Sequence, residues 1–117
     1  MLTGMQHAET TTDVTSAAYA TLPTGLSIAN SSTHKVYKNG NVITLTLNLS
    51  RTSDFVSGTS FQYINDGYRP QGRIFGIAFG AKNTIIPVYI TPEGKVTITF
   101  KDNTDTAAII TFTYLVA

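Results

Sequence analysis

The side chains in this 117-residue chain that could contact a ligand are mostly neutral, and many are tyrosines, hydroxyls and amides. A flat aromatic ring can pack against the C–H patches of a sugar, while amides and carboxylates can pair with its hydroxyl groups. The residues of suitable type are Tyr63, Tyr68, Tyr89, Asn65, Asp66 and Arg69. They are candidates for a saccharide site. The alternative for Tyr63 and Tyr89 is packing with the hydroxyl in water, and for Arg69 it is a hydrogen bond to backbone carbonyls that fixes a loop.

Catalytic and metal-binding chemistry finds little support in the sequence. The chain has no Cys and only two histidines, His7 and His34, which lie 27 positions apart and are both expected to face solvent. The seven acidic residues fall mostly in predicted turns, and their spacing sets no glycosidase pair apart. Residues 67–72 have the spacing of a phosphate-binding loop, but Arg73 and Ile74 follow where Lys and Ser or Thr are required. We therefore expect no catalysis, no metal and no cofactor.

The composition argues against several classes of partner. Only 13% of the residues are charged and the formal net charge is +1, with Lys and Arg scattered along the chain. A nucleic-acid surface or a polybasic membrane patch needs clustered positive charge, so neither is expected. No apolar run approaches the length of a membrane span, and residues 1–7 lack a signal pattern, so we expect no membrane insertion. The 20 threonines are β-branched and favour strands over helices.

From residue 26 onward, apolar residues alternate with polar ones, which is typical of strands. Asn39–Gly40 predicts a hairpin with a type I′ turn between strands at 34–38 and 41–49. Residues 92–94 (PEG) predict a second hairpin between 84–91 and 95–101. Further strands are predicted at 59–64, 73–80 and 107–116. Seven or eight short strands predict an all-β fold, an antiparallel β-sandwich or barrel that is jelly-roll-like.

The N-terminal part lacks this alternation. Residues 25–117 are therefore predicted to form the β domain, and residues 1–24 a lead-in or attachment segment. Within that segment Asp13 could cap a short helix, and an extended chain is the alternative. The helix would carry on one face Val14, Ala17, Ala18 and Leu22.

Three positions in the predicted strands carry further expectations. Pro87 should mark a sheet edge or a bulge. Gly76 and Ala78 leave room for close approach of another backbone or of a large side chain. The last strand is apolar on both faces, with Ile109 and Leu115 on the second one. That face should be covered, either within a sandwich as for an ordinary central strand or by a symmetric neighbour.

Five segments stand in a characteristic order and spacing. They are VYKNGNV at 36–42, GYRP at 67–70, an apolar strand at 74–79, VYITPEGKVTI at 88–98 and ITFTY at 110–114. In this arrangement, residues 26–117 resemble the C-terminal head domain of tail-tip proteins, the receptor-binding and baseplate proteins of siphophages that infect Gram-positive bacteria. The resemblance implies a β-barrel or sandwich that forms a homotrimer, binds host cell-wall saccharide without catalysis, and is located on the virion after synthesis in the host cytoplasm.

The resemblance also implies where the saccharide would bind. In relatives, the sugar contacts the outer face of the hairpin that matches residues 88–98. The matching outer positions here are Pro87, Tyr89, Thr97 and Thr99. The chain has no Trp, and the second arm of this hairpin presents threonines instead. The expected carbohydrate-binding residues are Tyr89, Thr97 and Thr99 on this face, together with Tyr68, Arg69 and Asp66, whose residue types suit a sugar. Residues 1–24 would attach the domain to other virion proteins.

Two other functions remain as alternatives at this point. A virion structural protein, such as a capsid decoration or head-fibre protein, would grip a lattice through residues 1–24 and would need no pocket. A wall-degrading enzyme is the third possibility, and the sequence provides no catalytic set for it.

Overall fold

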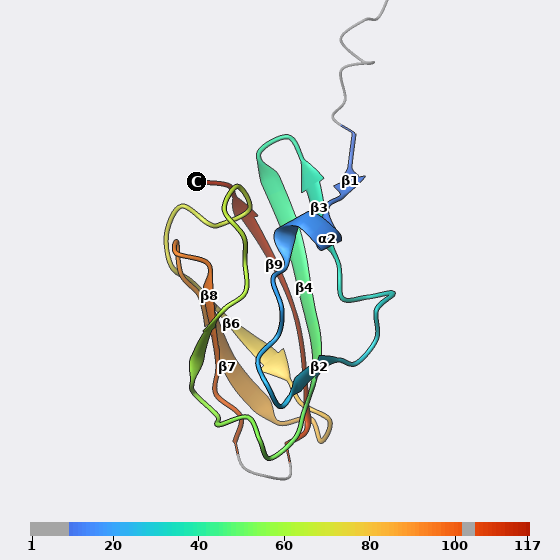
Figure 1. The fold of residues 1–117 in the computed structure, drawn as a ribbon, viewed down its shortest axis with the longest axis vertical. Coiled ribbons are helices and arrows are strands. Elements are labelled where there is room, and N and C mark those ends of the chain that lie inside the picture. Colours follow the sequence, from blue (N-terminus) through green and yellow to red (C-terminus); the bar gives the residue numbers. More distant parts are fainter. Residues whose placement is uncertain (1–9, 102–104) are drawn as a thin grey trace, which may run out of the picture.

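A single curled antiparallel sheet makes up most of the molecule (Figure 1). The computed structural model describes residues 10–101 and 105–117. The strand order is β1-β3-β4-β9-β6-β7-β8-β5, with β2 also pairing with β4, and the sheet forms a half-barrel around the core. The predicted all-β antiparallel class is confirmed. The elements are β1 (Thr12–Asp13), α2 (Thr15–Ala18), β2 (Leu26–Ile28), β3 (Val36–Asn39), β4 (Val42–Arg51), β5 (Ser60–Gln62), β6 (Ile74–Phe79), β7 (Ile85–Ile90), β8 (Lys95–Ile98) and β9 (Ala107–Leu115).

The strand count in the described residues is nine, where seven or eight were predicted. Two of these strands lie outside the predicted ranges: the short β2, which pairs with the end of β4, and β1, whose two residues lie opposite Lys38 and Tyr37 of β3. The residues of β1 belong to the segment without alternation, so periodicity gives no sign of them. In the same described residues, no helix has the length and apolar character needed to cross a membrane.

The core lies on the concave face of the sheet and follows the predicted alternation. On β4, the side chains of Ile43, Leu45, Leu47 and Leu49 are each 0% exposed, while the residues between them point outward. β9 pairs with β4 from Val42 to Ser50, so the two longest strands form the centre of the sheet.

The first hairpin forms where the sequence predicts it, but with a different turn. Asn39 pairs with Val42, so the turn residues are Gly40 and Asn41. Of these only Gly40 has a positive φ, 61°, which is the pattern of a type II′ turn. The predicted type I′ turn centred on Asn39–Gly40 is therefore wrong, because Asn39 remains in the strand ladder. In the second hairpin, Gly94 has a φ of 83°, as its predicted turn role requires.

Pro87 lies in a strand with partners on both sides, so its predicted place at a sheet edge is wrong. It pairs with Ile77 of β6 in regular register. Its carbonyl accepts a hydrogen bond from the Thr99 N–H at 2.9 Å, so the missing N–H of Pro87 also points towards the β8 side. Because β8 ends at Ile98, the proline falls where the ladder between β7 and β8 runs out.

The described part of the predicted lead-in packs against the sheet. A four-residue helix forms at Thr15–Ala18, and Asp13 Oδ1 accepts the Thr15 N–H at 2.9 Å, although Val14 occupies the N-cap. The chain then crosses to the end of β5, where Tyr19 and Ile64 form an isolated bridge. This segment thus runs from β1, at one edge of the sheet, to the chain that follows β5, the strand at the other edge.

His34 is buried, which corrects the prediction that it faces solvent. Its side chain is 1% exposed, and its ring stacks on Tyr19 with centroids 4.6 Å apart. The Asn48 N–H donates to Nδ1 at 2.9 Å, and Nε2 lies 2.8 Å from the Tyr63 hydroxyl. Both ring nitrogens are satisfied inside the core, so burial is possible without a charge. His7 lies outside the described residues.

Candidate functional site

The outward face of five neighbouring strands, β3, β4, β9, β6 and β7, carries no charged residue. Its centre is a threonine ladder made of two cross-strand pairs, in which Thr44 lies opposite Thr113 and Thr46 opposite Thr111. The hydroxyls of Thr46 and Thr111 are hydrogen-bonded at 2.9 Å. Two different surfaces flank this ladder.

The first surface is a strip of large apolar side chains, here called the apolar strip. Register places Phe79 beside both Ile85 and Ile109, and the other members continue along β6. These five side chains are 45–72% exposed, and nothing in the described chain covers them: Phe75, Ile77, Phe79, Ile85 and Ile109. The second face of the last strand, β9, was expected to be covered either by another part of the same chain or by a symmetric neighbour. In the described residues, no part of the chain covers it.

The small residues of β6 explain why its phenylalanines point outward. A Cβ on Gly76 would come within 2.7 Å of Ile110 Cδ1 and 2.8 Å of Phe112 Cε1. The inner face of β6 is thus occupied by large side chains of β9, as predicted for Gly76. Ala78 on the same face is 0% exposed. With the core side filled, the large residues of β6 lie on the outside.

A groove of about 430 Å³ runs along the apolar strip, here called the Tyr89 groove. It brings together three of the predicted saccharide-binding residues, Tyr89, Thr97 and Thr99. Phe75 meets Tyr89 edge to face with centroids 5.6 Å apart, and the Arg73 guanidinium lies 4.9 Å from the Tyr89 ring centroid.

The polar atoms of the Tyr89 groove are largely paired within the protein. Thr97 is only 7% exposed, and its hydroxyl lies 2.5 Å from that of Ser60. Hydrogen bonds from the side chains of Thr97 and Ser60 lower the pKa of Tyr89 from its ordinary value. The other lining residues are mainly apolar, so the groove offers a ligand few free hydrogen-bonding groups.

The other three predicted residues, Asp66, Tyr68 and Arg69, do not line the Tyr89 groove. Asp66 Oδ1 accepts the Gly67 N–H at 3.1 Å, and Arg69 Nε donates to the Ile64 carbonyl at 2.9 Å. The Tyr68 carbonyl accepts the Tyr114 hydroxyl at 2.5 Å. Arg69 thus makes the loop-fixing bond that the sequence left as its alternative role.

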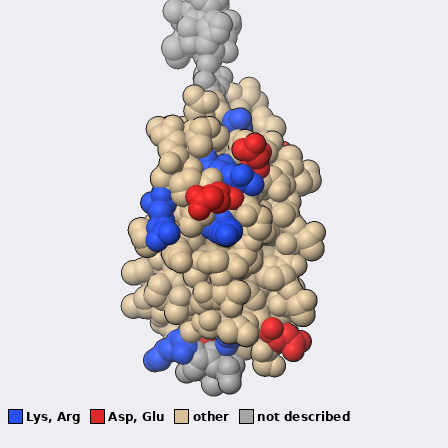
Figure 2. All heavy atoms as spheres, turned by 60° about the vertical axis from the view of Figure 1, so that its left-hand side comes forward, with Lys and Arg blue, Asp and Glu red and all other residues tan. Residues whose placement is uncertain are grey.

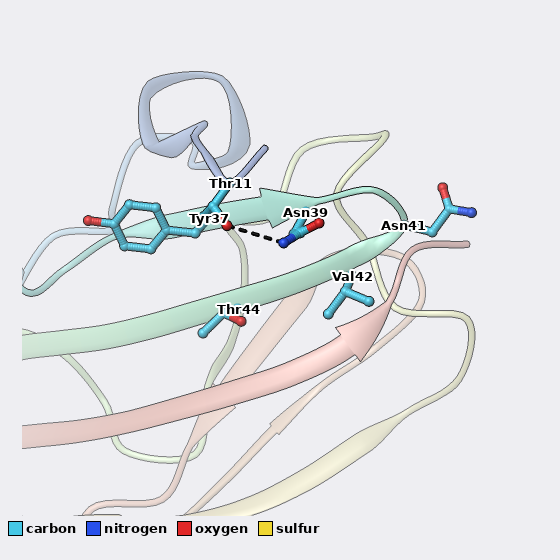
Figure 3. Close-up of a pocket in the computed structure, with 6 residues that line it drawn as sticks. All are labelled: Thr11, Tyr37, Asn39, Asn41, Val42 and Thr44. Atoms are coloured by element: carbon cyan, nitrogen blue, oxygen red, sulfur yellow. Dashed lines mark hydrogen bonds between the residues drawn. The ribbon is translucent and has the colours of Figure 1, made fainter. Parts of the chain in front are cut away.

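A second hollow, which sequence reasoning missed, lies on the opposite side of the threonine ladder. It has a volume of about 530 Å³ and is here called the hairpin hollow. Its lining comes from β3, the turn after it, β4 and the residue before β1: Thr11, Tyr37, Asn39, Asn41, Val42 and Thr44. Figure 3 shows Tyr37 at one end and Asn41 at the other, with the β4 side chains below. The alternation of apolar and polar residues in the first hairpin is a signal that could have revealed part of this hollow, because it places the lining residues of β3 and β4 on the same face of the sheet.

The hairpin hollow is rich in hydrogen-bonding groups. Asn39 Nδ2 donates to Thr11 Oγ1 at 3.2 Å (Figure 3). Among the described residues, no hydrogen-bond partner is found for the Tyr37 hydroxyl, the Thr44 hydroxyl or the Asn41 side-chain amide. None of the six lining residues is charged.

Few charges border these surfaces, and the one beside the Tyr89 groove is Arg73, whose guanidinium lies over the Tyr89 ring. The view in Figure 2, which turns the left-hand side of Figure 1 forward, shows one group of Lys, Arg, Asp and Glu over the upper half and a smaller group at the lower end, with an uncharged band between them. Near the hairpin hollow, Lys35 Nζ lies 3.5 Å from Asp13 Oδ2, so these two charges compensate each other. Within residues 10–101 and 105–117, no three His, Cys, Asp or Glu side chains gather as a metal site would require.

Comparison with known proteins adds no relative. No family model matches the chain, and no curated protein matches it either.

Proposed function

We propose that this chain is a non-catalytic head domain of a phage tail tip or tail fibre, which assembles as a homotrimer and binds saccharide on the host cell surface. The observation that carries the proposal is the uncharged outward face of β3, β4, β9, β6 and β7. That face combines a surface suited to a protein neighbour with a surface suited to a neutral, hydroxyl-rich ligand.

The apolar strip supports assembly with further copies of the chain. Its five side chains, which are 45–72% exposed, present an area of roughly 500 Å² per protomer, near the upper end for the largest apolar patch of a monomer. A contact between two such strips reaches the lower bound for specific interfaces, roughly 1,000 Å² in total. An uncharged face can also meet its own copy without like-charge repulsion. The number of copies in the proposed assembly, three, is taken from the family resemblance.

Saccharide is the class of ligand that fits the remaining polar surface. Threonine hydroxyls, asparagine amides and tyrosines offer donors and acceptors without a net charge. A neutral surface of this kind discriminates against phosphate and nucleic acid, whose binding depends on Lys and Arg. Several low-affinity sites on one trimer, and many trimers on one virion, would raise the overall affinity through multivalency.

The experiment that tests the proposal has two parts. The mass of the full chain in solution, measured by light scattering after size exclusion, should correspond to three chains of 12.6 kDa. The same material, placed on a glycan array and on isolated Gram-positive cell-wall polysaccharide, should bind at least one saccharide without releasing reducing sugar. A monomer that binds no saccharide or wall fraction would contradict the proposal.

The alternative role, a structural protein of the virion, draws on the apolar strip alone. A lattice of other virion proteins could cover that strip as a second copy would, with residues 1–24 as the attachment segment. Immunogold labelling of virions separates the two roles, because a receptor-binding head labels the tail tip and a decoration protein labels the capsid.

A further inference from the structure

The hairpin hollow and the Tyr89 groove differ in what they offer a ligand. The Tyr89 groove is continuous with the apolar strip, since Phe75 and Ile77 belong to both. Its Thr97 hydroxyl is already paired with Ser60. A saccharide placed there would leave many of its hydroxyls without partners, and such unpaired polar groups are costly once desolvated. This groove therefore suits a protein contact better than a sugar.

The hairpin hollow has the opposite character. The Tyr37 hydroxyl, the Thr44 hydroxyl and the Asn41 amide have no partner among the described residues, and all three residues line the hollow. An amide provides both a donor and an acceptor, and a hydroxyl provides both, so each group can adapt to a sugar hydroxyl. The Tyr37 ring is 39% exposed and can contact a C–H patch of the sugar.

The walls of the hollow are held by the sheet before any ligand arrives. Tyr37 and Thr44 are directly opposite each other in the ladder between β3 and β4. The Asn41 carbonyl accepts the Val116 N–H at 2.9 Å, which ties the turn to the C-terminal residues. A site whose backbone is already ordered loses less entropy on binding than a mobile loop does.

From these observations we propose that the hairpin hollow, and not the Tyr89 groove, is the saccharide subsite, and that its ligand is a neutral sugar unit. The inference rests on the proposed function and gives it a location. Tyr37 on β3 provides the aromatic contact, Thr44 on β4 provides a hydrogen bond beside it, and Asn41 provides hydrogen bonds from the turn.

The test uses the full chain and an array of neutral oligosaccharides, followed by titration calorimetry with the best binder. Tyr37→Ala should weaken that binding at least about tenfold, because both the ring contact and a hydroxyl are lost. Thr44→Val, which keeps the β-branched shape, should weaken it by about twofold to tenfold. Tyr37→Phe keeps the ring and should fall between wild type and Tyr37→Ala.

Matched controls decide between the two surfaces. Thr46→Val removes a hydroxyl from the same strand, outside the hollow, and should leave the dissociation constant within about twofold of wild type. Tyr89→Ala should do the same. If wild type binds sugar but Tyr89→Ala abolishes binding while Tyr37→Phe, Tyr37→Ala and Thr44→Val retain it, the hollow is the wrong site and the proposed function stands. If the wild-type chain binds no sugar on the array and no cell-wall fraction, both are wrong.

Discussion

Nε2 of His34 lies 2.8 Å from the Tyr63 hydroxyl oxygen, in the interior of the curled sheet. Because Nδ1 accepts the Asn48 N–H, the ring proton must be on Nε2, which therefore donates to Tyr63. Both side chains are about 1% exposed, and Tyr19 stacks on both rings. This neutral pair connects the N-terminal segment, β4 and the end of β5.

Acid should destabilise the fold through His34. Burial lowers the pKa of His34 from 6.5 to about 4. Between these values the unfolded chain binds a proton that the folded chain does not, so stability falls as the pH drops below 6.5 and levels off below 4. The loss amounts to at most about 3 kcal/mol. Urea unfolding at pH 7 and at pH 4.5 measures it.

The control for this effect is His34→Asn, which is less stable at every pH but has no imidazole to titrate. The difference in stability between wild type and His34→Asn should therefore shrink as the pH falls from 7 to 4.5. Parallel curves for the two proteins would show that His34 is not the group responsible.

Gly76→Ala should destabilise the protein. The new methyl group would press against Ile110 and Phe112 in the core, and overpacking of this kind costs about 1–3 kcal/mol. Gly72→Ala is the matched control, because nothing lies within 4 Å of the position of its Cβ. Denaturant midpoints of the two variants should differ clearly, and equal midpoints would argue against the close approach of β6 and β9.

Asp105→Ala should be more harmful than the removal of an exposed carboxylate. Asp105 is 1% exposed, and it accepts hydrogen bonds from the Thr84 hydroxyl at 2.5 Å and the Lys101 N–H at 3.3 Å. Leaving these donors unpaired should cost about 2–3 kcal/mol. Asp66→Ala should change stability by less than about 0.5 kcal/mol, since Asp66 is exposed and bonds only its neighbour Gly67. A thermal melt of each variant provides the comparison.

Phe79→Glu should break assembly without unfolding the protomer. Phe79 is 58% exposed at the centre of the apolar strip, so a charge there is harmless in a monomer and costly in a contact between copies. Val56→Glu is the control, because Val56 is 70% exposed but lies outside the strip. Light scattering should give a lower mass for Phe79→Glu alone. An unchanged trimer in both variants would place the interface elsewhere.

The fold could be predicted to the extent that it depends on alternation. β4 and its hairpin partner β3 have a clear period of two, and both form. The burial of His34 could not be predicted, because a single histidine at a strand start has no period, and its partner Tyr63 is 29 positions away. The turn differed for a local reason: Asn39 remains paired with Val42 in the ladder, so of the two predicted turn residues only Gly40 takes a positive φ.

Only three of the six predicted site residues lie together in one groove, because the two groups are positioned by different kinds of contact. Tyr89 and Thr97 are grouped by the register of one hairpin, which the sequence predicts. Asp66 and Arg69 belong to a loop whose position depends on contacts with distant segments, so their distance from Tyr89 has no sequence signature. The hairpin hollow needs Thr11, which comes from a stretch without any pattern.

The bridge between Tyr19 and Ile64 has a mechanical consequence. Tension that reaches Thr10 from the N-terminal side acts first on the two-residue ladder between β1 and β3, and then on the stacked rings of Tyr19 and Tyr63. Since Tyr19 also bonds the Thr46 carbonyl of the longest strand at 2.7 Å, the load passes into the centre of the sheet. A tether pulling on this end would thus be resisted by the core, and the apolar strip on β6, β7 and β9 would keep its shape under strain.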